Sequence, residues 1–120
     1  MGRIERLLAA LACLGGLTSV VAGAFAAHGM ADPLMKDVVR TGSTYGLVHS
    51  LAVFAALGLG RSRWAAILFL GGALLFSGSL YALALGAPHW LGAVTPLGGL
   101  SFMAGWAALG WACLAQRKPA

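Results

Sequence analysis

The sequence predicts an all-α, polytopic membrane protein: a bundle of four transmembrane helices, with a short amphipathic segment at the membrane interface after the first helix. Of the 120 residues, 60% are hydrophobic and only 9% are charged, whereas soluble domains usually carry about a quarter charged residues. The apolar residues form four runs, at 7–27, 43–60, 64–86 and 94–115. Each run is close to the ~20 residues that cross a bilayer as a helix. We therefore expect residues 1–120 to form one transmembrane domain.

The first run resembles a secretory signal peptide, because Arg3 and Arg6 precede it and small residues end it. Its length favours a retained helix instead, since the apolar core of a signal peptide is shorter. We interpret it as the first transmembrane helix.

The loop after this run begins with Asp32 followed by Pro33, an N-cap residue and then a proline at the first helical position. Its apolar and charged residues then fall on opposite sides of a helix: Leu34, Met35, Val38 and Val39 against Lys36, Asp37 and Arg40. This pattern predicts an amphipathic interfacial segment that leads into the second helix, with a bend at Gly42. In the third loop, Trp90 is expected at the depth of the lipid headgroups.

The positive charges predict the orientation. With four spans, the side that holds both termini carries Arg3, Arg6, Arg61, Arg63, Arg117 and Lys118. The other side carries Lys36 and Arg40, offset by Asp32 and Asp37. The positive-inside rule then places both termini in the cytoplasm of a multi-pass inner-membrane protein. Because the basic residues sit at the ends of apolar runs rather than in one polar patch, no nucleic-acid partner is expected.

Small residues repeat along every apolar run. In lipid, helices associate through close backbone approach at small residues. We therefore expect helix contacts at Gly15, Ser19, Gly23, Ala27, Gly42, Gly46, Gly78 and Gly105.

Polar residues gather in the outer half of the predicted bundle. The candidate site consists of His28, Tyr45, His49, Ser77, Ser79, Tyr81 and Thr95. At 1.5 Å per residue, His49 lies ~9 Å and Tyr81 ~8 Å below the outer helix ends. One interpretation is a structural hydrogen bond from His49 to the first or third helix, with Tyr81, Ser77 or His28 as the partner. The other is an active role as a ligand or proton relay.

Metal and haem sites are weaker alternatives. His28, His49 and His89 would converge only if the third loop folds inward, and a metal site needs three or four ligands. A bis-histidine haem needs a wide apolar slot that closely packed glycine faces tend to close. Cys13 and Cys113 lack metal-binding spacing and are interpreted as buried small apolar residues. We predict no cofactor and no metal.

Four motifs resemble one known family. They are "GAFAAHG", "YGLVHSLAV", "LFSGSLYALAL", and "TPLGG" ahead of "GW", in that order between residues 15 and 111. They are similar to the domain-of-unknown-function 423 family, whose eukaryotic relatives are described as transmembrane protein 256. The resemblance implies a four-helix inner-membrane protein, with relatives in mitochondria, and implies no activity. Ala26 stands where the family usually has glycine, and Gly46 where it usually has glutamine.

Three functions remain open. The first is a structural or accessory protein that forms a homo-oligomer or supports a larger membrane complex, which the small-residue faces favour. The second is a binder of a small molecule, metal or haem at the outer-half residues. The third is a small-solute transporter, which the lack of an acidic residue within any apolar run disfavours. We predict no catalytic residues, because the sequence shows no nucleophile and base pair, no paired carboxylates and no phosphate loop.

Overall fold

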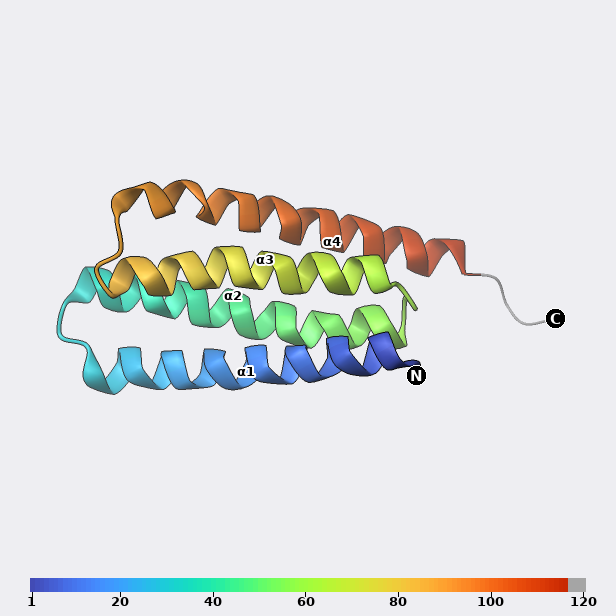
Figure 1. The fold of residues 1–120 in the computed structure, drawn as a ribbon, viewed down its shortest axis with the longest axis horizontal. Helices are drawn as coiled ribbons and strands as arrows, with labels where there is room; N and C mark the ends of the chain where they lie inside the picture. Colours follow the sequence, from blue (N-terminus) through green and yellow to red (C-terminus); the bar gives the residue numbers. More distant parts are fainter. Residues whose placement is uncertain (117–120) are drawn as a thin grey trace.

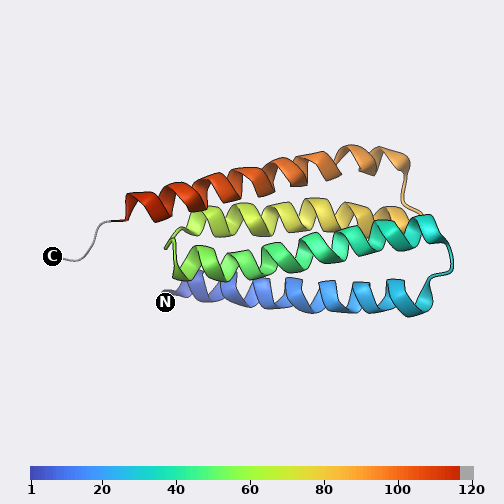
Figure 2. The same cartoon turned by 180° about the vertical axis from the view of Figure 1, so that it is seen from behind.

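The computed structural model describes residues 1–116, which form four α-helices and one short 3-10 helix. They are α1 (Arg3–Gly29), α2 (Pro33–Gly58), α3 (Arg63–Ala84), η1 (His89–Ala93) and α4 (Thr95–Ala115). The helices run side by side and antiparallel in chain order, with short connections at the two ends (Figures 1 and 2). The predicted all-α class is confirmed. α1, α3 and the segment His89–Ala115 are long and apolar enough to cross a membrane.

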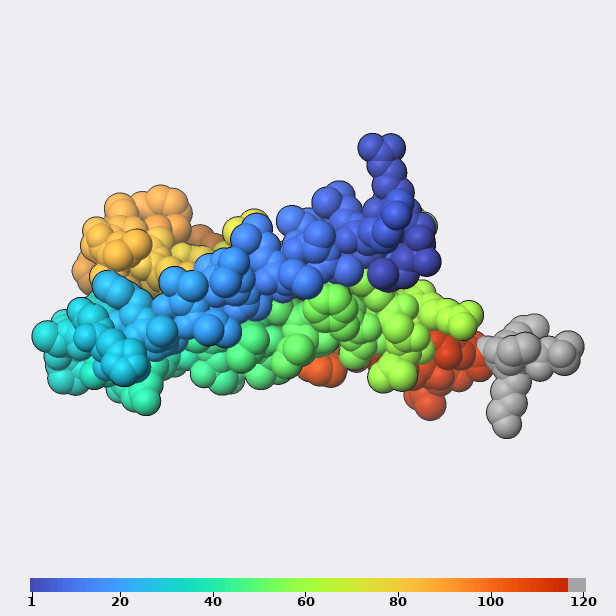
Figure 3. All heavy atoms as spheres, turned by 90° about the horizontal axis from the view of Figure 1, so that it is seen from below, coloured from blue at the N-terminus to red at the C-terminus, as the bar shows by residue number. Residues whose placement is uncertain are grey.

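The second helix, α2, falls outside that group because polar residues interrupt its apolar run. It nevertheless packs against both α1 and α3, and two of its polar side chains, those of His49 and Ser50, are turned inward. His49 is 4% exposed and Ser50 is 3% exposed. When the molecule is viewed from the side on which α1 lies, α1 and α2 form much of its visible surface (Figure 3). α2 therefore buries these two polar side chains against its neighbours, while Asp37, Arg40 and Thr41 stay exposed.

The start of α2 confirms the predicted cap. Asp32 Oδ1 accepts a hydrogen bond from the Leu34 amide at 3.0 Å, and Pro33 occupies the first position. The amphipathic segment expected to lead into the second helix is the first part of α2, and the bend expected at Gly42 is absent, because α2 continues through this residue without interruption. Gly42 fits a regular helix here because its missing side chain leaves room for the Tyr81 ring, 2.8 Å from where a Cβ would stand.

Most of the predicted small residues lie where another helix approaches closely. A Cβ added at Gly23 would lie 2.8 Å from Ser43 Oγ, and one at Gly105 would lie 2.7 Å from a ring carbon of Phe69. Such distances are too short for a real side chain, so each glycine sets how closely its helix packs. Gly15, Gly42 and Gly46 face side chains of neighbouring helices in the same way.

Two of the expected packing residues lie elsewhere. An added Cβ at Gly78 would meet no atom of the described residues within 4 Å, and Ala27 is exposed while Ala26 is fully buried. The buried positions of α1 are Leu8, Ala12, Ser19 and Ala26. Ala12, Ser19 and Ala26 are seven residues apart, and Leu8 lies one turn before them. A strict four-residue repeat gradually rotates away from that stripe. The expected series from Gly15 to Ala27 therefore leaves the interface at its last member.

Candidate functional site

His49 lies in an aromatic cluster built by three helices. Its ring stacks on Phe102 of α4, with ring centroids 3.5 Å apart and planes 9° apart. Phe69 of α3 lies 5.7 Å from the His49 ring, and Trp106 of α4 contacts it edge-on at 5.9 Å. Tyr45, one turn earlier on α2, extends the cluster towards Phe76. His49 thus joins α2 to α3 and α4 inside the bundle.

Both ring nitrogens of His49 are already hydrogen-bonded. The Trp106 indole Nε1 donates to His49 Nε2 at 3.0 Å, and His49 Nδ1 lies 2.7 Å from the Tyr45 carbonyl oxygen. An indole N–H can only donate and a carbonyl can only accept, so the His49 proton must be on Nδ1 and the ring must be neutral. This arrangement leaves no lone pair for a metal or a haem iron. It favours a structural role.

The expected partner of His49 was wrong. The sequence pointed to Tyr81, Ser77 or His28 on the third and first helices, whereas the structure places Trp106 of α4 there. Sequence reasoning missed Trp106 because tryptophan in an apolar run usually anchors a helix at the membrane interface. The signal in the sequence is Trp106 itself, a donor-only side chain within the fourth apolar run that needs an acceptor when it is turned towards the bundle.

The other predicted histidines lie apart from this cluster. His28 and His89 are both exposed, and Tyr45 is 46% exposed. Among residues 1–116, no group of three or more His, Cys, Asp or Glu side chains could hold a metal ion. Cys13 and Cys113, interpreted as buried from the sequence, are exposed on the outer faces of α1 and α4.

The predicted serines and threonine join neighbouring helices. The Ser77 hydroxyl donates to the Gly42 carbonyl oxygen at 2.6 Å, which links α3 to α2. Ser79 and Thr95 share a hydrogen bond between α3 and α4. Two further serines act in the same way outside the predicted set. Ser43 donates to the Ser19 carbonyl oxygen, and Ser101 donates to the Leu68 carbonyl oxygen. Much of the outer-half polar level is therefore used in helix packing.

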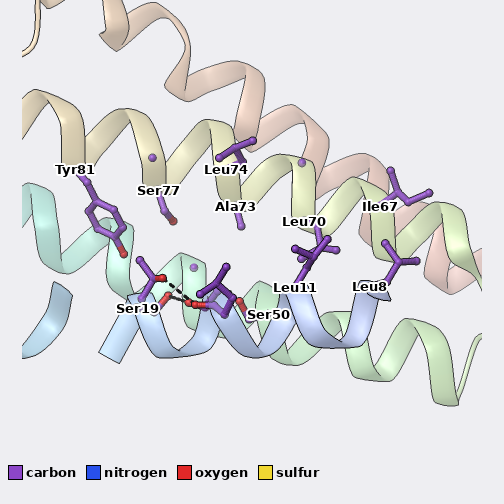
Figure 4. A pocket seen from close by; sticks show the side chains of 16 residues that line it. Leu8, Leu11, Ser19, Ser50, Ile67, Leu70, Ala73, Leu74, Ser77 and Tyr81 are labelled. Atoms are coloured by element: carbon purple, nitrogen blue, oxygen red, sulfur yellow. Dashed lines mark hydrogen bonds between the residues drawn. The ribbon is translucent and has the colours of Figure 1, made fainter. Parts of the chain in front are cut away.

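A groove between α1 and α3 is the clearest binding feature. Its volume is about 520 Å³, within the range of about 300–1,000 Å³ for small-molecule sites. The walls come from α1 and α3, and α2 contributes to the floor (Figure 4). The apolar walls are formed by Leu8, Leu11, Leu14, Ile67, Leu70 and Leu74.

The floor of the groove carries hydroxyl groups. A Cβ added at Gly46 would lie 2.6 Å from Ser19 Oγ and 3.0 Å from Ser77 Oγ, so both hydroxyls stand over this glycine. The Tyr81 side chain points from α3 towards Ser19 (Figure 4). Within the described residues, Tyr81 Oη and Ser50 Oγ are buried without a hydrogen-bond partner. Ser50 was missed as a site residue because its place in a stripe of small residues suggested packing alone.

A second hollow continues the groove towards the end of the bundle that holds the α1–α2 loop. It has a volume of about 460 Å³ and shares Thr18 and Tyr81 with the first. Its other walls include Phe25, Met35 and Leu85. Tyr81 thus stands between two apolar compartments.

Comparison with known proteins identifies the family. The profile of the family described as "Protein of unknown function (DUF423)" matches residues 22–99. A UPF0382 membrane protein of Haemophilus influenzae is 42% identical over 109 residues, which cover 84% of this chain and 88% of the relative. A UPF0382 membrane protein of Schizosaccharomyces pombe is 39% identical, with 82% and 94% covered. The UPF0382 inner membrane protein YgdD of Escherichia coli is 35% identical, with 86% of each chain covered.

No solved structure matches the chain with significant similarity. The family match covers the second and third helices, with Ser50, Ser77 and Tyr81 of the groove, whereas Ser19 lies before it. The family profile and the membrane proteins that align with most of the chain show that this chain belongs to the DUF423 family of membrane proteins.

Proposed function

We propose that the chain crosses an inner membrane four times, with α2 as the fourth span and both termini in the cytoplasm. α2 lies alongside α1 and α3 over their length (Figure 1), so a bilayer that holds its neighbours also surrounds it. Trp64 and Trp111 are exposed near one end of the bundle and Trp90 near the other, as expected for the two aromatic belts of a membrane protein.

The charges support this orientation. Arg3, Arg6, Arg61 and Arg63 lie at the end that holds the N-terminus and the α2–α3 turn, while Arg117 and Lys118 lie outside the described residues. The first part of α2, with Asp37 and Arg40 exposed, then lies at the opposite interface as its amphipathic section.

Cysteine labelling in intact cells tests the topology. In a variant with Cys13 and Cys113 replaced by alanine, we expect a Gly2→Cys residue to be protected from an impermeant thiol reagent. An Ala31→Cys residue, in the α1–α2 loop, should react. The reverse pattern would place the termini outside and overturn the proposed orientation.

We propose further that the protein binds a hydrophobic membrane molecule in the α1–α3 groove. The observation that carries this is the groove itself, with leucine walls and two buried hydroxyls that lack partners among the described residues. Gly78 lines the groove with open space in front of it. A cavity with apolar walls and a few fixed polar groups is typical of small-molecule sites. This keeps the second of the functions expected from the sequence and moves its site from His49 to the groove.

A pair of glycine variants tests ligand binding. Gly78→Leu should fill the groove without displacing a helix, because an added Cβ meets no described atom within 4 Å. Gly110→Leu is the matched control, since Gly110 is equally open but lies on α4, which does not line the groove. After purification in mild detergent, mass spectrometry should find the same enriched chain-bearing molecule in the wild type and the Gly110→Leu protein. It should be absent from the Gly78→Leu protein. Equal amounts in all three would exclude the groove as the site.

An accessory role in a homo-oligomer or a larger membrane complex is the second candidate. It is favoured by Gly99 and Gly110, which lie eleven residues apart on α4 and face open space within the described structure. Eleven residues are close to three helical turns, so both glycines lie on the same face and would allow another helix to approach closely. Cross-linking of an Ala107→Cys protein in native membranes tests this face. A specific cross-linked product that Gly110→Leu abolishes would support the accessory role, and its absence would oppose it.

A further inference from the structure

We infer that the molecule bound in the groove carries an uncharged oxygen acceptor, such as a ketone, quinone or ester carbonyl, that receives hydrogen bonds from Ser50 and Tyr81. This inference rests on the proposed function of the groove. It adds the chemistry of the ligand and where its polar atom lies.

The hydrogen bonds at the floor determine which groups remain free to donate. The Ser19 hydroxyl donates to the Gly15 carbonyl oxygen at 2.8 Å, and the Ser77 hydroxyl donates to the Gly42 carbonyl oxygen at 2.6 Å. Their protons are therefore committed to the backbone. The Ser50 and Tyr81 hydroxyls have no partner within hydrogen-bond geometry among residues 1–116, although the Tyr81 hydroxyl lies near those of Ser19 and Ser77. Ser50 is 3% exposed. An acceptor oxygen on a ligand would give both hydroxyl protons a partner.

The walls exclude a charged head group. None of the described side chains that line the larger hollow is ionisable apart from Tyr81. An ionised phosphate or carboxylate placed here would lose its hydration without gaining an opposite charge, which is strongly unfavourable. The acceptor is therefore neutral, and the head group of an ordinary phospholipid does not fit.

The shape of the groove places the acceptor within the apolar skeleton rather than at its end. Leu8, Leu11 and Ile67 extend the larger hollow towards the inner end, and Phe25 and Leu85 extend the smaller hollow towards the outer end. Tyr81 borders both hollows. A neutral molecule with apolar arms on both sides of a carbonyl group would occupy both hollows and bring its oxygen to the hydroxyls.

Direct binding of two matched probes tests the inference. The probes are dioctyl ketone and heptadecane, which have chains of equal length and differ by one carbonyl oxygen. Binding of the radiolabelled probes is measured with the purified full chain in mild detergent. One hydrogen bond contributes about 0.5–1.5 kcal/mol, so we expect the wild type to bind the ketone about two- to twelvefold more tightly for each hydrogen bond formed.

Ser50→Ala and Tyr81→Phe should each reduce this preference, and the double variant should bind both probes equally. Removing a buried hydroxyl that has no partner should not lower the melting temperature of the unliganded protein, so loss of preference is distinguishable from misfolding. Ser101→Ala is the control: it loses the hydrogen bond to the Leu68 carbonyl oxygen on the α3–α4 interface and should keep the ketone preference.

If the wild type binds both probes equally, the groove remains a binding site and the inference about its ligand is wrong. If the wild type binds neither probe, both the groove proposal and this inference are overturned.

Discussion

At the scale of single residues, the surroundings of a polar side chain decide its role more than its type does. An intramembrane histidine suggested a ligand or proton relay from the sequence, because burying such a group is costly. In the structure His49 is a neutral ring with both nitrogens hydrogen-bonded and one face on Phe102. Ser50 was not among the candidate site residues, yet its hydroxyl, like that of Tyr81, is buried without a hydrogen-bond partner among the described residues.

Replacing Trp106 tests the role of His49. Trp106→Phe removes the indole donor and leaves His49 Nε2 without its hydrogen bond. Interhelical hydrogen bonds in membranes average about 0.6 kcal/mol, with the best near 1.7, so we expect the free energy of unfolding in detergent to fall by about 1 kcal/mol.

Trp111→Phe is the control, because Trp111 is 74% exposed and its change should have little effect. A double-mutant cycle with His49→Phe isolates the pair. A coupling energy of zero would show that the hydrogen bond contributes nothing to stability.

At the scale of helices, adjacent glycines of α4 have opposite environments. Gly98 is buried against the backbone of Phe76, so an added Cβ there would overlap α3, whereas Gly99 faces open space in the described structure. The motif "TPLGG" therefore contains one contact glycine and one outward-facing glycine. Gly98 was not among the expected packing residues, because the four-residue repeats drew attention to Gly105.

The two glycines provide a matched pair of alanine substitutions. Gly98→Ala should push α4 away from α3 and destabilise the protein by about 1–3 kcal/mol, the usual cost of overpacking. Gly99→Ala should be neutral or stabilise by up to about 1 kcal/mol, because alanine is the better helix former. Melting curves of both variants in the same detergent measure the difference. Equal stabilities would mean that α4 is not held to α3 at Gly98.

The sequence predicted the helices and much of the close packing for a physical reason. Length and apolarity follow from the thickness of the bilayer, and glycine marks close backbone approach wherever helices meet. It could not predict which neighbour each face meets, because that depends on how the four helices are arranged in space. The partner of His49, the open position of Gly78 and the burial of Gly98 all depend on that arrangement.

The groove was beyond sequence reasoning for the same reason. Ser19, Ser50 and Tyr81 come from three helices, and only the gap between α1 and α3 brings them to one surface. A bend at Gly42 was expected between the amphipathic segment and the second apolar run, but α2 extends as one helix from Pro33 through both.

At the scale of the whole molecule, α1 is tied to α3 at the end of the groove near the N-terminus. Arg63 Nε donates to Glu5 Oε1 at 2.8 Å, and this ion pair bridges the first turns of the two helices. Further along, the groove separates their walls. An ion pair thus joins α1 to α3 at the N-terminal end of the bundle. Along the groove, α2 connects the two helices by packing against both.

This ion pair predicts a pH dependence. The hydrogen bond from Arg63 holds the pKa of Glu5 below its ordinary value. A lowered carboxyl pKa contributes stability that is fully present above the ordinary pKa and is lost as the pH falls through the lowered value. The melting temperature in detergent should therefore fall in acid. The exposed pair contributes little, so the fall should be small.

Arg63→Gln should make the melting temperature less dependent on pH over that acidic range, because the cause of the shift is removed. Arg61→Gln is the control, since Arg61 lies in the same turn and the Glu5 hydrogen bond comes from Arg63. An unchanged acid dependence in Arg63→Gln would assign the effect to other groups.

The inward-facing polarity of α2 has a consequence for biosynthesis. As it leaves the ribosome, α2 presents His49 before α3 and α4 exist to cover its ring. α1 is already available, and Ser43 can donate to its Ser19 carbonyl oxygen. We expect α2 to enter the bilayer as a hairpin with α1, so that translocation of α2 alone in an insertion assay should be inefficient and improve when α1 precedes it.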